Sequence, residues 1–192
     1  AAGSAFEFGA AAGVYGADLV AAVASLLQSG IADETGLLAE PYFTEGCAFA
    51  SGALTVTQAD IRELQKAKAA IAAGVRLLCG KVGIRSADDV GRVFLAGGFG
   101  YFLSPADAAV IGLLPAELSE KCVPVGNAVL LGLTKYAALR GDDTDITALR
   151  GGDADLVALQ AAARPFNLAE EEAFNETYLA LMELRPYRLF EG

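Results

Sequence analysis

The sequence predicts an α/β fold, with helices flanking strands, and three observations lead to this prediction. Apolar residues recur at helical spacing from Thr57 to Gly83. The apolar run Val93–Ala96 follows and leads directly into Gly97-Gly98-Phe99-Gly100. Ser104-Pro105 then begins another helix. Helices and strands that alternate along a chain are typical of layered α/β domains.

The first predicted helix is preceded by glycines. Its apolar face comprises Leu19, Val23, Leu26 and Leu27, and Gly30 suits its C-terminal end. Gly16 and Ala17 stand at its N-terminus, where backbone amides can face an anion, so they are a candidate phosphate-side turn. We interpret Asp18 as a helix cap rather than a ligand contact, since its carboxylate would repel phosphate. An alternating Phe6-Glu7-Phe8 could form a short strand upstream.

Residues 31–56 are irregular and favour short strands around Phe43, Phe49 and Leu54–Val56. The long helix begins after them at a clear signal. Thr57 can cap it, and Asp60 can reach back to the cap in a capping-box-like arrangement. Its length suits a spine between two lobes.

Val93–Ala96 reads as a buried strand, and the Gly-Gly-x-Gly run after it has two interpretations. It can be a ligand loop, because glycines let a ligand approach the backbone closely, or a plain tight turn. Cys122–Val125 predicts a short strand near a sheet edge because it contains Pro124. Gly126-Asn127 then begins a helix over 128–139.

The C-terminal part predicts a surface loop, a strand over 164–168 and a last amphipathic helix over 169–183. Asp143 and Asp145 lie in the loop near Gly141. This loop lacks the spacing and final glutamate of an EF-hand, so we do not expect calcium there.

Composition excludes several kinds of function. The net charge is −10 and the 14 lysines and arginines are scattered, which argues against a nucleic-acid partner. No apolar run is long enough to cross a bilayer, so no membrane partner is expected.

The cysteines, Cys47, Cys79 and Cys122, form no CxxC pair and cannot alone hold zinc or an iron–sulfur cluster. Reduced, buried thiols suit a cytoplasmic protein. The absence of histidine removes Ser-His-Asp and Cys-His catalysis, and no catalytic residue is identified.

Three sequence blocks carry a resemblance to a known family. They are Thr57–Ile71, Val93–Gly100 continued by Ile111–Pro115, and Val125–Ala128; residues 16–33 match more loosely. In this order they resemble the C-terminal part of the reductive activators of corrinoid proteins, the ATP-dependent enzymes that reactivate cobalamin-bearing methyl carriers. That family is similar to acetate and sugar kinases, heat-shock chaperone ATPases and actin.

The resemblance implies an actin-like ATPase (ribonuclease H-like) lobe, a mixed sheet flanked by helices, that binds ATP with Mg²⁺. Gly97 and Gly98, with Phe99 and Gly100, would then be the adenosine motif. Gln65 and Lys68, on the preceding long helix, would lie beside the adenine and ribose. Gly16-Ala17-Asp18 stands where the family has a Gly-Ser-Gly-like turn, with a hydroxyl lost and a charge gained. Binding of phosphate and magnesium therefore does not follow from the sequence.

The resemblance also implies partners. Full-length members carry an N-terminal [2Fe–2S] domain that passes an electron to Co(II) of a corrinoid protein. We expect this chain, residues 1–192, to be the C-terminal portion of such an oxidoreductase, a fragment of a longer protein unable to perform the redox chemistry alone. Residues 1–139 are the best-matched part, and 140–192 would be a helical extension with a short strand. A homodimer is possible and is left open.

Two other functions compete with this ATP-binding lobe. The same fold could be a docking module for a corrinoid protein, with weak or no ATP binding. A small-molecule kinase is the third candidate, for which no catalytic aspartate is placed. Binding of ATP, binding of a cobalamin protein and phosphorylation of a small substrate would separate the three.

Overall fold

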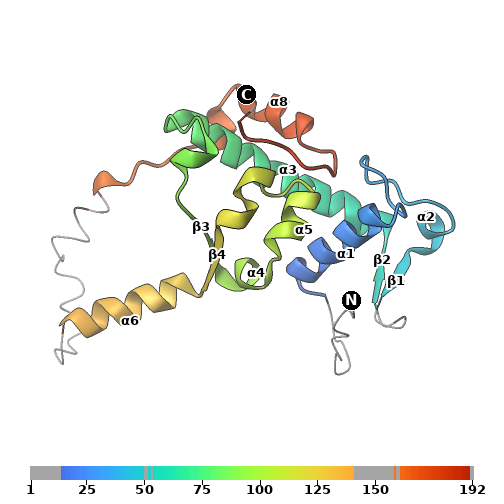
Figure 1. Ribbon diagram of the computed structural model, residues 1–192, viewed down its shortest axis with the longest axis horizontal. Coiled ribbons are helices and arrows are strands. Elements are labelled where there is room, and N and C mark those ends of the chain that lie inside the picture. Colours follow the sequence, from blue (N-terminus) through green and yellow to red (C-terminus); the bar gives the residue numbers. More distant parts are fainter. Residues whose placement is uncertain (1–13, 50–51, 53, 141–157, 159–160, 191–192) are drawn as a thin grey trace.

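The computed structural model describes residues 14–49, 52, 54–140, 158 and 161–190 (Figure 1). Its elements, in chain order, are α1 (Gly16–Gln28), α2 (Tyr42–Glu45), β1 (Cys47–Phe49), β2 (Leu54–Val56), α3 (Gln58–Lys81), the 3₁₀ turn η2 (Ala87–Asp89), β3 (Val93–Ala96), α4 (Gly97–Phe102), α5 (Pro105–Val110), η3 (Ala116–Lys121), β4 (Cys122–Gly126), α6 (Ala128–Arg140), η5 (Leu168–Glu170) and α8 (Ala173–Ala180).

The strands of the described residues form two separate two-stranded sheets. β1 and β2 are antiparallel, with Cys47 opposite Val56. β3 and β4 are parallel, with Val93 opposite Cys122 and a register shift that brings Ala96 opposite Gly126. The connection from β3 to β4 runs through α4, α5 and η3, because parallel strands need a crossover. The predicted α/β class is confirmed, with helices around small sheets.

The helix α3 is the spine of the fold (Figure 1). Thr57 is its N-cap: Asp60 N donates to Thr57 Oγ1 at 3.3 Å, and Thr57 N donates to Asp60 Oδ2 at 2.9 Å. Gly83, with φ +75°, follows its C-terminal end. The predicted helix and its capping box are therefore confirmed.

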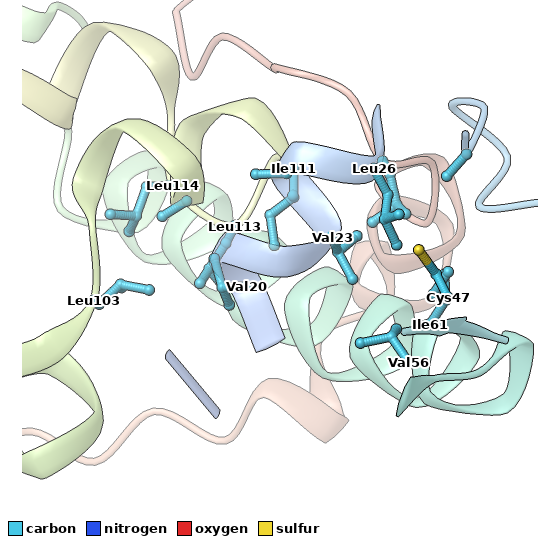
Figure 2. Packing of buried hydrophobic residues seen from close by; sticks show 14 of the residues in the cluster. Val20, Val23, Leu26, Cys47, Val56, Ile61, Leu103, Ile111, Leu113 and Leu114 are labelled. Atoms are coloured by element: carbon cyan, nitrogen blue, oxygen red, sulfur yellow. The ribbon is translucent and has the colours of Figure 1, made fainter. Parts of the chain in front are cut away.

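The main hydrophobic core lies between α1, α3 and the segment after α5. Figure 2 shows side chains from these elements, together with Cys47 of β1 and Val56 of β2, meeting in one cluster. Val20, Val23 and Ile61 are completely buried there. Each such aliphatic side chain contributes about 1.5–3 kcal/mol on burial, so this cluster holds α1 and α5 on the spine.

The C-terminal segment, residues 181–190, runs back over α3 after α8 (Figure 1). Leu181 and Tyr187 pack against Ala72 and Ala73 of α3 in a second cluster. Two backbone hydrogen bonds hold the segment: Leu184 N donates to Glu34 O at 2.7 Å, and Ala116 N donates to Tyr187 O at 3.0 Å. The end of the chain thus ties three distant regions together.

Several sequence-based expectations about elements are wrong. Phe43 lies in the short helix α2 rather than in a strand. The segment 164–168 forms no strand; its first four residues are irregular and η5 begins at Leu168, and Pro165 could donate no ladder hydrogen bond. The last helix is confined to α8. The expected strand at 6–8 and the acidic loop at 141–145 lie outside the described residues.

The strand β3 exists as predicted, but it is not buried. Only Leu95 of its four residues is buried, and Phe94 remains 61% exposed. In the described residues β3 pairs with β4 alone, and the side chain of Phe94 is left uncovered. A run of four apolar residues does not distinguish a covered strand from a half-covered one.

Candidate functional site

The glycines after β3 form the first turn of the short helix α4, not an open turn as the sequence suggested. Gly97 has φ +79°, a left-handed conformation that favours glycine and turns the chain sharply from strand into helix. We call Gly97, Gly98, Phe99 and Gly100 the glycine corner. The sharp turn at this corner requires glycine at position 97, because other residues rarely adopt a positive φ.

The backbone of the glycine corner is open on one side. A Cβ placed on Gly97 or on Gly98 would meet no heavy atom within 4 Å, and both residues are exposed. Gly100 differs, because a Cβ there would lie 2.9 Å from the carbonyl carbon of Leu95. Gly100 therefore serves the packing of α4 against β3, whereas Gly97 and Gly98 leave backbone accessible to a ligand.

The N-terminus of α1 lies against the same corner. A Cβ on Gly16 would be 3.2 Å from two ring carbons of Phe99, and Ala17 is buried. The structure thus brings together two glycine-containing turns, at Gly16 and at Gly97, that are 81 residues apart in the sequence. Asp18 Oδ2 accepts a hydrogen bond from Tyr15 N at 3.2 Å, which confirms the capping interpretation. Its carboxylate opposes an anion at this helix end.

The strand β4 adds a third turn, which the sequence-based list of site residues missed. Parallel strands end at the same edge of a sheet, so Gly126 lies opposite Ala96, beside the start of the glycine corner. A Cβ on Gly126 would be 3.6 Å from the Tyr101 ring. Asn127 Oδ1 accepts from Leu130 N at 3.0 Å and caps α6. The sequence signal that could have identified this turn is the pair Gly126-Asn127, which lies in the third block of family resemblance, Val125–Ala128.

Gln65 lies elsewhere, beneath the C-terminal segment, and is 3% exposed. Its Nε2 donates to Thr35 O at 2.9 Å and to Met182 O at 3.1 Å, and its Oε1 accepts from Arg62 Nη1 at 2.7 Å. The bonds to Thr35 and Met182 join α3 to flanking segments, and the bond from Arg62 lies within α3. The position predicted beside the adenine is thus occupied by a structural hydrogen-bond network.

Lys68, one turn further along α3, is 1% exposed. Its Nζ donates to Glu183 O at 2.5 Å, so it also holds the C-terminal segment. Burial lowers the pKa of the Lys68 ammonium to about 8, against an opposing attraction by Glu183. The structure does not bring Gln65 or Lys68 to the glycine corner, and their role as nucleotide contacts stays a prediction.

Lys68 should make stability depend on pH in a definite direction. Below pH 8 the Lys68 ammonium is charged in both the folded and the unfolded chain. Between pH 8 and 10.5 the unfolded chain binds more protons than the folded one, so the free energy of unfolding rises with pH. We expect a gain of roughly 2 kcal/mol in unfolding free energy between about pH 7.5 and 9.5, relative to Lys68→Met. Above about pH 10 the raised pKa of Tyr187 opposes this trend. Denaturant unfolding across this range measures the effect.

The control is Lys66→Met, because Lys66 is exposed on the same helix and pairs with Glu63. This variant should follow the wild-type pH profile. If the unfolding free energies of Lys68→Met and of the wild-type chain change in parallel with pH, the lowered pKa does not belong to Lys68.

Large apolar side chains on β3, α4, β4 and α6, the elements that form or follow the glycine corner, remain exposed. They are Phe94, Phe99, Tyr101, Phe102, Val123, Val129, Leu130, Leu131 and Leu133. In Figure 1, α6 extends away from the rest of the fold beyond β4. Apolar patches of this kind mark surfaces that contact another protein or domain.

The described residues contain no group of three or more histidine, cysteine, aspartate or glutamate side chains placed to hold a metal ion. Cys47, Cys79 and Cys122 are free thiols on three different elements, and burial raises the pKa of Cys79 and of Cys122. Within the same residues, no helix combines the length and apolar character that a membrane span requires.

Comparisons with known proteins agree on one group. A family model described as the C-terminal domain of RACo, the ASKHA domain, matches residues 3–190. The corrinoid activation enzyme RamQ of Eubacterium limosum is 36% identical over 83 residues, which make up 43% of this chain and 14% of that protein. A solved structure of a reductive activator for a corrinoid, iron–sulfur protein superimposes with a TM-score of 0.71 at 29% identity. The match covers 91% of this chain and 28% of that one.

Proposed function

Since this chain belongs to the family of the RACo C-terminal ASKHA domain, we propose that it is the ATP-binding lobe of a reductive activator acting on a corrinoid protein. The chain spans less than a third of the solved relative. Activity, substrate and partner of the whole protein are therefore part of the proposal.

The open backbone of Gly97 and Gly98 carries the nucleotide part of this proposal. Ligands of α/β sheets bind beyond the carboxyl ends of parallel strands, and the glycine corner and Gly126 lie at that edge of β3 and β4. A ligand can approach the bare backbone where a Cβ would meet only open space. These residues fit an adenosine group, whereas the buried Gln65 and Lys68 support the fold in this arrangement.

ATP, when bound, would supply the free energy for the unfavourable transfer of an electron to Co(II). Gly97 and Gly98 would position its adenosine part through backbone contacts. Magnesium would arrive with the phosphates, because such ions are held largely by substrate oxygens. The three dispersed thiols do not fit a [2Fe–2S] cluster, so the electron donor of this proposal is a separate iron–sulfur domain.

A docking module without strong ATP binding is the second candidate. Two observations favour it: Asp18 places a carboxylate at the N-terminus of α1, and apolar side chains are exposed around the glycine corner. A corrinoid protein would then bind this surface directly.

Isothermal titration calorimetry with MgATP tests the proposal. A saturable heat with a Kd in the micromolar range that is lost in Gly98→Val supports the ATP-binding lobe. Absence of ATP binding, together with binding of a cobalamin-loaded corrinoid protein, would favour the docking module.

A further inference from the structure

A cavity of about 510 Å³ lies between α3 and the C-terminal segment. Its charged and aromatic lining residues are Lys68, Arg76, Glu183, Arg185, Tyr187 and Arg188. In Figure 1 the C-terminal segment lies at the top of the molecule with α8 and α3, and α4 lies below α3, beside β4. The cavity is thus distinct from the glycine corner, and its volume lies within the range of small-molecule sites.

The charge of this cavity is opposite to that of the chain. Four of its described lining residues are cationic and one, Glu183, is anionic, although the whole chain has a net charge of −10. Glu183 Oε2 is paired with Arg185 Nε at 3.0 Å. No salt bridge joins Lys68, Arg76 or Arg188 to a carboxylate of the described lining residues, although Glu183 attracts the Lys68 ammonium at longer range. Clustered cations with low-dielectric walls concentrate anions.

The hydrogen bonds of the buried Lys68 and the half-buried Arg76 go to neutral groups rather than to carboxylates. Lys68 Nζ donates to Glu183 O, which leaves further N–H donors on the ammonium. Arg76 Nη2 donates to Arg188 O at 2.8 Å, and its guanidinium stacks 5.4 Å from the centre of the Tyr187 ring. These contacts fix the position of both cations without neutralising them.

Two polar atoms of the cavity residues are buried without a partner in the described part of the chain: Arg76 Nε and the Tyr187 hydroxyl. Tyr187 is 8% exposed. A buried donor without an acceptor costs about 1–3 kcal/mol, so such atoms point to a ligand or an ordered water. Glu117 Oε2 is also buried without a partner, and Glu117 acts electrostatically on Tyr187. A water molecule that bridges Glu117 Oε2 and the Tyr187 hydroxyl is therefore the alternative to a ligand.

We propose that this cavity binds a small molecule with two or more oxyanion groups, either phosphorylated or polycarboxylic. Guanidinium groups match the oxygens of phosphate and carboxylate alike, and the lysine ammonium and tyrosine hydroxyl add single donors. The ligand would join α3 to the C-terminal segment, since each supplies part of the site. This inference does not depend on the nucleotide proposal.

Calorimetry with pyrophosphate, and separately with citrate, at constant ionic strength tests the site. The double variant Arg185→Gln/Arg188→Gln should weaken anion binding at least about tenfold. Both side chains are exposed, so the variant should keep its fold. Lys66→Gln, on the exposed face of α3, and Gly98→Val should bind as the unmodified chain does. Binding of pyrophosphate alone assigns a phosphorylated ligand, and binding of citrate alone a polycarboxylic one.

Tyr187→Phe supplies a second measurement that separates a ligand from a buried water. If the hydroxyl serves a ligand, the variant should melt at the same or a higher temperature without anion and show weaker anion binding. Failure of both anions to bind, or unchanged affinity in the double variant and in Tyr187→Phe, would overturn the proposal.

Discussion

Replacing Gly98 by valine should lower the affinity for MgATP by about a hundredfold, which corresponds to about 2.7 kcal/mol, while the melting temperature stays unchanged. A Cβ on Gly98 meets no atom of the described structure within 4 Å, and the residue does not have a positive φ. The added side chain therefore has room in the free protein. It would occupy the space through which a nucleotide approaches the backbone of the glycine corner. Calorimetry and thermal unfolding of the same variant measure both quantities.

Gly91→Val is the matched control. Gly91 is also exposed, has open space around its Cβ position and precedes β3 instead of following it. This variant should bind MgATP as the unmodified chain does. If the unmodified chain, Gly98→Val and Gly91→Val bind MgATP with equal affinity, the nucleotide does not bind at the glycine corner. If Gly98→Val melts at a lower temperature, its loss of binding reflects a change in the fold rather than a local effect.

Replacing Gly112 by alanine should destabilise the fold by about 4 kcal/mol, near the upper end for a single substitution. Gly112 is buried with φ +73°, so a Cβ alone costs about 1–2 kcal/mol in backbone strain. That Cβ would also overlap the carbonyl oxygen of Arg185 and lie 3.1 Å from Lys68 Nζ. The C-terminal segment would have to move away from α3 and lose contacts of Tyr187. Denaturant unfolding measures the loss.

Gly30→Ala isolates the strain from the overlap. Gly30 has nearly the same φ, +72°, but no atom lies within 4 Å of its Cβ position. The expected cost is about 1 kcal/mol. Similar losses in both variants would mean that the contact between Gly112 and the C-terminal segment does not limit stability.

Features set by neighbouring residues could be predicted from the sequence. Thr57 and Asp60 are three residues apart, so their mutual hydrogen bonds follow from helix geometry alone. The same holds for the Asp18 cap of α1. The run Val93–Gly100 likewise predicted a strand that leads into a glycine-rich segment, because its residue types constrain the local backbone.

Features set by distant residues could not be predicted. Helical spacing places Gln65 and Lys68 on one face of α3, but their partners lie up to 117 residues away. A polar residue on a helix face looks the same in sequence whether a nucleotide or a chain segment covers it. The exposure of Phe94 has the same origin, because burial depends on what packs above the strand.

Residue order was sufficient to identify the family, the spine helix with its cap and the glycines of the corner. Those depend on residue order and short-range geometry. The tertiary structure alone decided that Gly16 lies against Phe99 and that Gln65 and Lys68 hold the C-terminal segment. It also gathered Lys68, Arg76, Arg185 and Arg188 around one cavity, because only chain folding brings a helix and a segment more than a hundred residues later into contact.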